Sequence, residues 1–187
     1  KLRAYTYLYP PVGVDVYADD PVYNDPDAAA EAAVREVERG FTGVKFDPAG
    51  RYSVFDGRQP ALHAMDLSVK MVRAVREAIG TRADILFGTH GQFSASGAIR
   101  LAKHLEKYDP LWFEEPVPPD SPEEIAKVAR ATSIPISAGE RLTTKYEFHQ
   151  LLKTGAASIL QPNLGRCGGL LEGKKIASMA EVYHAQI

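Results

Sequence analysis

The chain has 187 residues, 45% of them hydrophobic and 25% charged, and a formal net charge of −2. This is the composition of a globular protein with one sizeable core, and the near-neutral charge argues against a surface for nucleic acid or an anionic membrane. No apolar stretch approaches the roughly 20 residues that cross a bilayer. Cys167 is the single cysteine, which excludes an internal disulfide and a Cys-rich zinc site. We therefore expect a cytoplasmic protein.

Short β-like runs alternate with longer helical patterns along the chain. A strand is expected at Leu2–Leu8, followed by a Pro/Gly/Asp-rich loop and a helix at Pro26–Arg39, which Asp25 can cap. Residues 185–187 look like the start of a seventh strand. The other strands are expected at Gly43–Phe46, Asp84–Phe87, Leu111–Phe113, Ile134–Ser137 and Ser158–Leu160, and the other helices at Met65–Ile79, Ser96–Lys107, Pro122–Ala131, Lys145–Lys153 and Leu171–Tyr183.

This alternation predicts an α/β fold with a parallel sheet and crossover helices. Six strand–helix units and the start of a seventh favour a TIM-type (β/α) barrel, and because a complete barrel needs about eight strands, residues 1–187 are expected to form a partial one. An open doubly wound sheet is the alternative, but no Gly-x-Gly-x-x-Gly motif follows the first strand.

The stretch "LWFEEPVPP" places two adjacent acids, Glu114 and Glu115, at the carboxyl end of a buried strand. Pro116 cannot continue the strand, so it ends there. Two acids at the end of a buried strand are costly unless something pairs with them.

Polar residues stand at the ends of the other expected strands as well. Because the carboxyl ends of barrel strands surround one mouth, these side chains are expected to meet there. Oxygen ligands from neighbouring strands with a lysine nearby are typical of a divalent-cation site for an anionic substrate. Each residue taken alone has a plainer explanation, as a helix cap, a surface salt bridge or a structural histidine. The residues are Lys45, Asp47, His90, Glu114, Glu140, Arg141 and Asn163.

At these residues the sequence resembles the mandelate racemase-like branch of the enolase superfamily, and in particular its acid-sugar dehydratases. The motifs that carry the resemblance are "GVKFD" (Gly43–Asp47), "WFEEP" (Trp112–Pro116), "AGERL" (Ala138–Leu142) and "QPNLGRCGG" (Gln161–Gly169). The resemblance implies a modified (β/α)7β barrel whose capping domain and last strands are absent from residues 1–187. It also implies a homo-oligomer that uses Mg²⁺ to abstract the proton α to the carboxylate of a small-molecule substrate.

The metal ligands are carried over by position. Glu114 matches the second ligand of the family and Glu140 the third, whereas the first, an aspartate, aligns with Gly88. Three possibilities remain for that gap: His90 acts as a ligand, waters fill the position, or the metal site is weak.

The other site residues follow in the same way. Lys45 matches a lysine that contacts the substrate carboxylate or the enediolate oxygen, and His90 matches the acid that helps the β-hydroxyl leave. Asp47 stands where relatives carry a second lysine, and Asn163 where they carry the aspartate that orients a base histidine, which is expected just past Ile187. Asp47, Asn163 and Arg141 are candidates for substrate binding, although Arg141 could equally form a salt bridge with Glu115.

The resulting hypothesis is a Mg²⁺-dependent lyase that dehydrates a sugar acid to a 2-keto-3-deoxy acid. An epimerase or lactone cycloisomerase of the same superfamily would share the proton abstraction. A non-catalytic barrel with a degenerate metal site is the alternative from a different class.

Overall fold

The computed structural model describes residues 3–8, 21–49 and 59–187. Its centre is a six-stranded sheet in the order β1-β2-β3-β4-β5-β6, in which neighbouring strands are parallel. Gln186 adds a parallel bridge to Ile159, so the seventh strand expected at residues 185–187 begins there. The strands are β1 (Thr6–Tyr7), β2 (Gly43–Phe46), β3 (Asp84–Gly88), β4 (Trp112–Glu114), β5 (Ile136–Ala138) and β6 (Ile159–Leu160).

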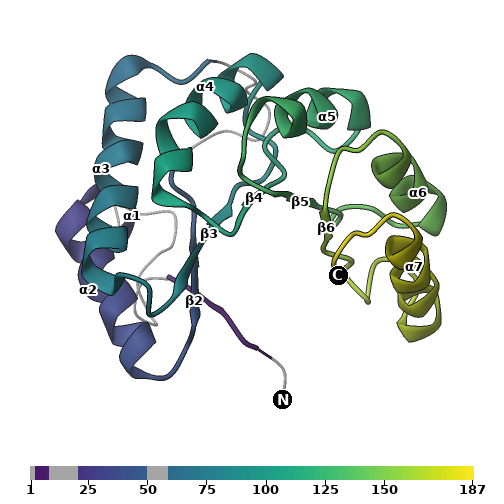
Figure 1. The fold of residues 1–187 in the computed structure, drawn as a ribbon, viewed down its shortest axis with the longest axis horizontal. Helices are drawn as coiled ribbons and strands as arrows, with labels where there is room; N and C mark the ends of the chain where they lie inside the picture. Colours follow the sequence, from purple (N-terminus) through teal and green to yellow (C-terminus); the bar gives the residue numbers. More distant parts are fainter. Residues whose placement is uncertain (1–2, 9–20, 50–58) are drawn as a thin grey trace.

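The helices lie along one side of this sheet, which curves away from them as an arch (Figure 1). Each strand is followed by a helix that returns the chain to start the next parallel strand, so the predicted partial (β/α) barrel is confirmed. The helices are α1 (Pro21–Asn24), α2 (Pro26–Glu38), α3 (Leu62–Ile79), α4 (Ala95–Leu105), η1 (Glu106–Tyr108, a 3₁₀ turn), α5 (Pro122–Ala131), α6 (Lys145–Lys153) and α7 (Leu170–Val182).

The two faces of the sheet have different compositions because successive side chains of a strand point to opposite sides. The face toward the helices is apolar, and its side chains form one core with the buried helix residues. The opposite, concave face carries Lys45 and Glu114 together with Tyr5, Leu86 and Trp112. The apolar face is built from Val44, Phe46, Ile85, Phe87, Phe113, Ile136, Ala138 and Leu160.

Helix ends follow the capping signals of the sequence. Asp25 caps α2 through a hydrogen bond from the Asp27 N–H, and Thr144 and Glu147 form a capping box at the start of α6. Several expectations were wrong in detail, and among the described residues the strand expected at Leu2–Leu8 forms only at Thr6–Tyr7. α3 begins at Leu62 instead of Met65, α1 lies in a segment expected to be a loop, and η1 replaces the last turn of the helix expected to run to Lys107. Leu2, the start of the expected first strand, lies outside the described residues.

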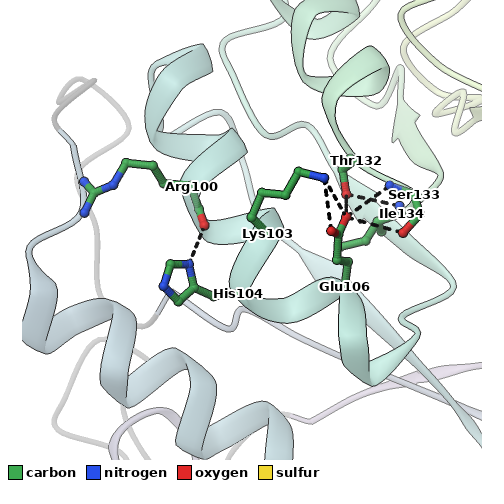
Figure 2. A network of polar contacts seen from close by, with 7 residues as sticks. All are labelled: Arg100, Lys103, His104, Glu106, Thr132, Ser133 and Ile134. Carbon is green, nitrogen blue, oxygen red and sulfur yellow. Dashed lines mark hydrogen bonds and ion pairs between the residues drawn. The ribbon is translucent and has the colours of Figure 1, made fainter.

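Glu106 joins the end of α4 to the loop before β5 (Figure 2). Its carboxylate accepts hydrogen bonds from Lys103 Nζ at 3.1 Å, Thr132 Oγ1 at 3.0 Å and the Ser133 N–H at 3.2 Å. A single side chain thus fixes how two successive βα units meet.

Candidate active site

A cavity of about 790 Å³ lies on the concave face of the sheet. Its lining includes Lys45 from β2, Glu114 from β4, Glu140 from the loop after β5 and Asn163 from the loop after β6. The structure therefore brings four of the predicted site residues to one mouth. Asp47, His90 and Arg141 are not part of this lining.

Lys45 and Glu114 form an ion pair in the wall of the cavity. The Nζ atom of Lys45 lies 2.5 Å from Oε2 of Glu114, and the two side chains are 10% and 1% exposed. A pair so far removed from water interacts more strongly than a surface pair, because the surrounding dielectric is low. The ammonium also lies 5.9 Å from the ring centre of Tyr5 and 5.5 Å from that of Tyr7.

Glu115 turns away from its neighbour to a different partner. Its φ of 35° takes the chain out of the extended conformation of β4. The fully buried carboxylate accepts a hydrogen bond from Arg141 Nε at 2.7 Å, and Arg141 Nη2 donates to the His90 carbonyl at 3.0 Å. Burial raises the pKa of Glu115, and the Arg141 charge opposes that rise. Of the two possibilities for Arg141, the salt bridge is the one formed.

Asp47 and His90 are linked through Gln92, a residue that the sequence did not single out. The backbone N–H of His90 donates to Gln92 Oε1 at 2.7 Å, and Gln92 Nε2 donates to Asp47 Oδ2 at 3.0 Å. Burial raises the pKa of Asp47 from 3.8 to about 7, against the hydrogen bonds from Ala49 and Gln92, which lower it. These contacts fix the loop that carries His90.

Glu140 and Asn163 are the more accessible members of the cavity. Gly139, which precedes Glu140, has a φ of 129°, and a Cβ atom there would come within 2.5 Å of Phe148 Cε1, so the turn requires glycine. Asn163 is exposed, and its Oδ1 accepts a hydrogen bond from the backbone N–H of Arg166 at 3.2 Å. Both side chains can reach a ligand in the cavity.

Three buried, uncharged polar atoms, on β4, on β5 and directly after β6, have no hydrogen-bond partner within the described ranges. They are Trp112 Nε1, Ser137 Oγ and Gln161 Oε1, and both Trp112 and Gln161 line the cavity. Buried polar groups in proteins are nearly always paired, so atoms of this kind call for a partner. The wall of the cavity is therefore suited to a ligand rich in hydroxyl or carboxyl groups.

The residues do not form the three-ligand metal site that the resemblance implies. Within residues 3–8, 21–49 and 59–187, no three His, Cys, Asp or Glu side chains are grouped so that they could hold a metal ion. Glu114, Glu140 and His90 therefore do not converge on one point. The reason is visible at Gly88, where Lys45 and Tyr7 fill the space of a side chain, and at Glu114, where the Lys45 ammonium supplies the positive charge.

Similarity to known proteins agrees with this architecture. Residues 28–187 match the family described as Enolase C-terminal domain-like. The chain belongs to this family. It is 38% identical over 177 residues to the D-xylonate dehydratase of Haloferax volcanii, a match that covers 92% of this chain and 42% of the relative.

Solved structures give the same result. A candidate mandelate racemase/muconate lactonizing enzyme from Labrenzia alexandrii DFL-11 superposes with a TM-score of 0.92 at 62% identity, covering 100% of this chain and 46% of that one. A candidate dehydratase from Salmonella enterica serovar Typhimurium superposes with a TM-score of 0.84 at 30% identity, covering 98% of this chain and 48% of that one. The chain thus spans less than half the length of these relatives.

No helix within the described ranges combines the length and the apolar character needed to cross a bilayer.

Proposed function

We propose that the complete protein carrying this chain is an acid-sugar dehydratase, a hydro-lyase acting on a polyhydroxy monocarboxylate. The observation that carries the proposal is the Lys45–Glu114 pair in a cavity whose wall presents further polar atoms. The 38% identity to a D-xylonate dehydratase supports the same reaction type. In this reaction the proton α to the carboxylate is removed, the β-hydroxyl leaves with a proton as water, and the resulting enol tautomerises to a 2-keto-3-deoxy acid.

We assign to Lys45 the binding of the oxygen atoms of the substrate carboxylate. Negative charge develops there when the α-proton leaves, and an ammonium placed beforehand in a low-dielectric wall stabilises that charge without reorganising. The Tyr5 and Tyr7 rings and Glu114 hold the ammonium in the wall of the cavity. Lys45 therefore binds and orients the reacting end of the substrate.

His90 is assigned to the leaving hydroxyl. An imidazole titrates near neutral pH and is well matched to donating a proton there. The Gln92 and Arg141 contacts to its backbone fix the loop that carries His90, whose side chain is not part of the cavity lining. Asn163 is assigned to a substrate hydroxyl because it lines the cavity, and Asp47 and Arg141 act through the groups they hold rather than by direct contact.

Mg²⁺ is typical of the enolase superfamily and is the cofactor to be tested. Glu114 and Glu140 are the two carboxylates in the cavity wall that a cation would meet. No role assigned to Lys45, His90 or Asn163 depends on it. The homo-oligomer and the cytoplasmic location also stay as predictions from the sequence.

The test uses the complete gene product, incubated with a panel of aldonic and aldaric acids that includes D-xylonate. Formation of a 2-keto acid is measured with Mg²⁺ and with a chelator, and α-proton exchange is followed in D₂O. Lys45→Met is expected to lower kcat by about 10²–10³-fold, as for loss of a group that stabilises developing charge. Lys175→Met, which removes an exposed lysine paired with Glu172, is the matched control and should retain activity.

If α-proton exchange is observed without a 2-keto acid product, the proposed function changes from dehydratase to epimerase or cycloisomerase. If no acid gives either product or α-proton exchange, the non-catalytic barrel is favoured.

A further inference from the structure

Two side chains from other strands occupy the space beside Gly88. A Cβ atom at Gly88 would lie 2.6 Å from Lys45 Cε, 2.8 Å from Tyr7 Oη and 3.0 Å from Tyr7 Cε2. Real Cβ atoms are not found at such distances, so residue 88 cannot carry a side chain while Tyr7 and Lys45 keep their places. Glycine is the residue that allows so close an approach to the backbone.

Register explains how the three residues meet. Tyr7 of β1 pairs with Lys45 of β2, and Gly88 of β3 pairs with Glu114 of β4, two residues further toward the carboxyl ends of the strands. Because side chains two residues apart share a face, all four positions are on the concave side. The Lys45 side chain passes Gly88 to reach Glu114, and the Tyr7 ring also lies close to Gly88.

Two contacts hold the Tyr7 side chain, one through its hydroxyl and one through its ring. Its hydroxyl donates a hydrogen bond to the Gly88 carbonyl at 3.1 Å, and its ring centre lies 5.5 Å from Lys45 Nζ. A lysine has a flexible four-carbon stem and is not held by one ion pair alone. A ring face within about 6 Å attracts an ammonium, more strongly where water is excluded.

We propose that Tyr7 is a positioning residue, which occupies the side-chain space of residue 88 and holds the Lys45 ammonium against Glu114. The inference rests on the proposed function for what Lys45 does, but not for where Lys45 is held. Tyr7 and Lys45 together occupy the space of the carboxylate that the family resemblance implies at this position. The ring holds the lysine, and the hydrogen bond to the Gly88 carbonyl is a further contact of the same side chain.

The first test measures the position of Lys45 without using activity. The complete gene product is treated with an amine-modifying reagent, and the rate of modification at Lys45 is followed by peptide mapping, with exposed Lys175 as the internal reference. Tyr7→Phe keeps the ring and should keep Lys45 protected. Tyr7→Leu should raise the Lys45 rate toward that of Lys175, and unchanged protection in Tyr7→Leu would overturn the proposal.

Tyr146→Leu is the matched control, because Tyr146 is an exposed ring 4.7 Å from the ammonium of Lys145 and does not line the cavity. It removes the same kind of contact and should leave the Lys45 rate as it is. Thermal unfolding of each variant separates a local release of Lys45 from a general loss of folding.

The second test is kinetic. Misplacing a reacting group by about 1 Å can lower a rate about 10²-fold, so Tyr7→Leu is expected to reduce kcat by about that factor while Tyr7→Phe stays near the unaltered protein. Gly88→Ala introduces the crowded Cβ atom and should also expose Lys45, but less so in a Tyr7→Phe background, where the 2.8 Å contact is gone. Equal effects of Gly88→Ala in both backgrounds would contradict a shared space.

The proposed function and the positioning role of Tyr7 can be disproved independently of each other. If the complete protein shows no activity but Tyr7→Leu still releases Lys45, the proposed function is wrong and the positioning role stands. If activity is present and Tyr7→Leu changes neither kcat nor the protection of Lys45, the positioning role is wrong and the function stands.

Discussion

Glu114 and Glu115 are neighbours in the sequence, yet each meets a cation from a different part of the fold. Glu114 faces the cavity and pairs with Lys45, whereas Glu115 turns through a positive φ and pairs with Arg141. Burial is tolerated in both cases because a positive charge lies within hydrogen-bond distance. The second pair also holds the His90 carbonyl, so it supports the loop of a proposed catalytic residue.

Replacing Arg141 by Met is expected to destabilise the protein by about 3 kcal/mol, at the low end for a broken buried pair. The lower end applies because Arg141 is 31% exposed while Glu115 is 0% exposed. Denaturant unfolding of the complete protein measures the change. Lys145→Met, which removes a more exposed partner of Glu172, should cost at most about 1 kcal/mol. An equal effect of the two substitutions would show that the burial of Glu115 carries no penalty.

At the residue scale, four of the seven predicted site residues line the cavity, and Asp47, His90 and Arg141 do not. The sequence raised the Arg141–Glu115 salt bridge as one possibility, but it did not predict that Glu114 pairs with Lys45. Lys45, Glu114, Glu140 and Asn163 were predicted from strand ends and line the cavity. The absence of a carboxylate at Gly88 was equally visible. The side chain that fills the gap was not, because Tyr7 lies 81 residues earlier and meets Gly88 only through the sheet.

Polar side chains also link successive elements of the fold, and Glu106 is the clearest example (Figure 2). The hydrogen bond from Lys103, and then those from Ser133 and Thr132, lower the pKa of Glu106 from 4.5 to about 2. A carboxyl group whose pKa is lower in the folded state stabilises the fold at pH values above its unfolded pKa. That contribution is lost as the pH falls through the folded value.

The stability contributed by Glu106 should therefore be present above about pH 4.5 and decline toward pH 2. Glu106→Gln removes the titrating group and should flatten this part of the stability profile, measured as the unfolding midpoint against pH. Glu124→Gln, at an exposed pair with Lys127, serves as the control and should leave the profile unchanged. A Glu106→Gln profile that follows the unaltered protein would remove Glu106 from the acid response.

Element boundaries were predicted well where a chemical signal marks them and less well elsewhere. Gly43–Phe46 and Pro122–Ala131 match the observed β2 and α5. The strand expected from Ile134 instead begins at Ile136, because Pro135 has no N–H to donate to the sheet. α3 extends back to Leu62, which is 77% exposed and lies outside the buried face of the helix.

At the scale of the whole molecule, the described residues form a curved sheet with one apolar face packed against the helices and a concave face that lines the cavity. Phe113 is central to the packing face, since its ring lies edge-on to Phe87 at 6.0 Å and to Phe93 at 6.4 Å between ring centres. The same strand places Glu114 on the concave face. Strand β4 thus belongs to both the core and the site.

Phe113→Ala should cost about 3–5 kcal/mol of unfolding free energy, because it removes a fully buried ring from a close-packed core. Leu170→Ala, at a side chain that is 78% exposed, should change stability by no more than about 0.5 kcal/mol. Chemical denaturation of both variants of the complete protein provides the comparison. A small effect at Phe113 would mean that the helices are held on the sheet by other contacts.

The alternation of side chains along the strands also bears on how a protein of this kind acquires new activities. Substitutions at Lys45, Gly88 or Glu114 alter the surface that a substrate meets and leave the layer beneath the helices as it was. Substitutions on the concave face are therefore separated from those on the apolar face, and evolution can change the chemistry of the site while the apolar core is kept. A variant library at concave positions of β2, β3 and β4 should replace Lys45 and Glu114 together, because either substitution alone leaves a buried charge unpaired.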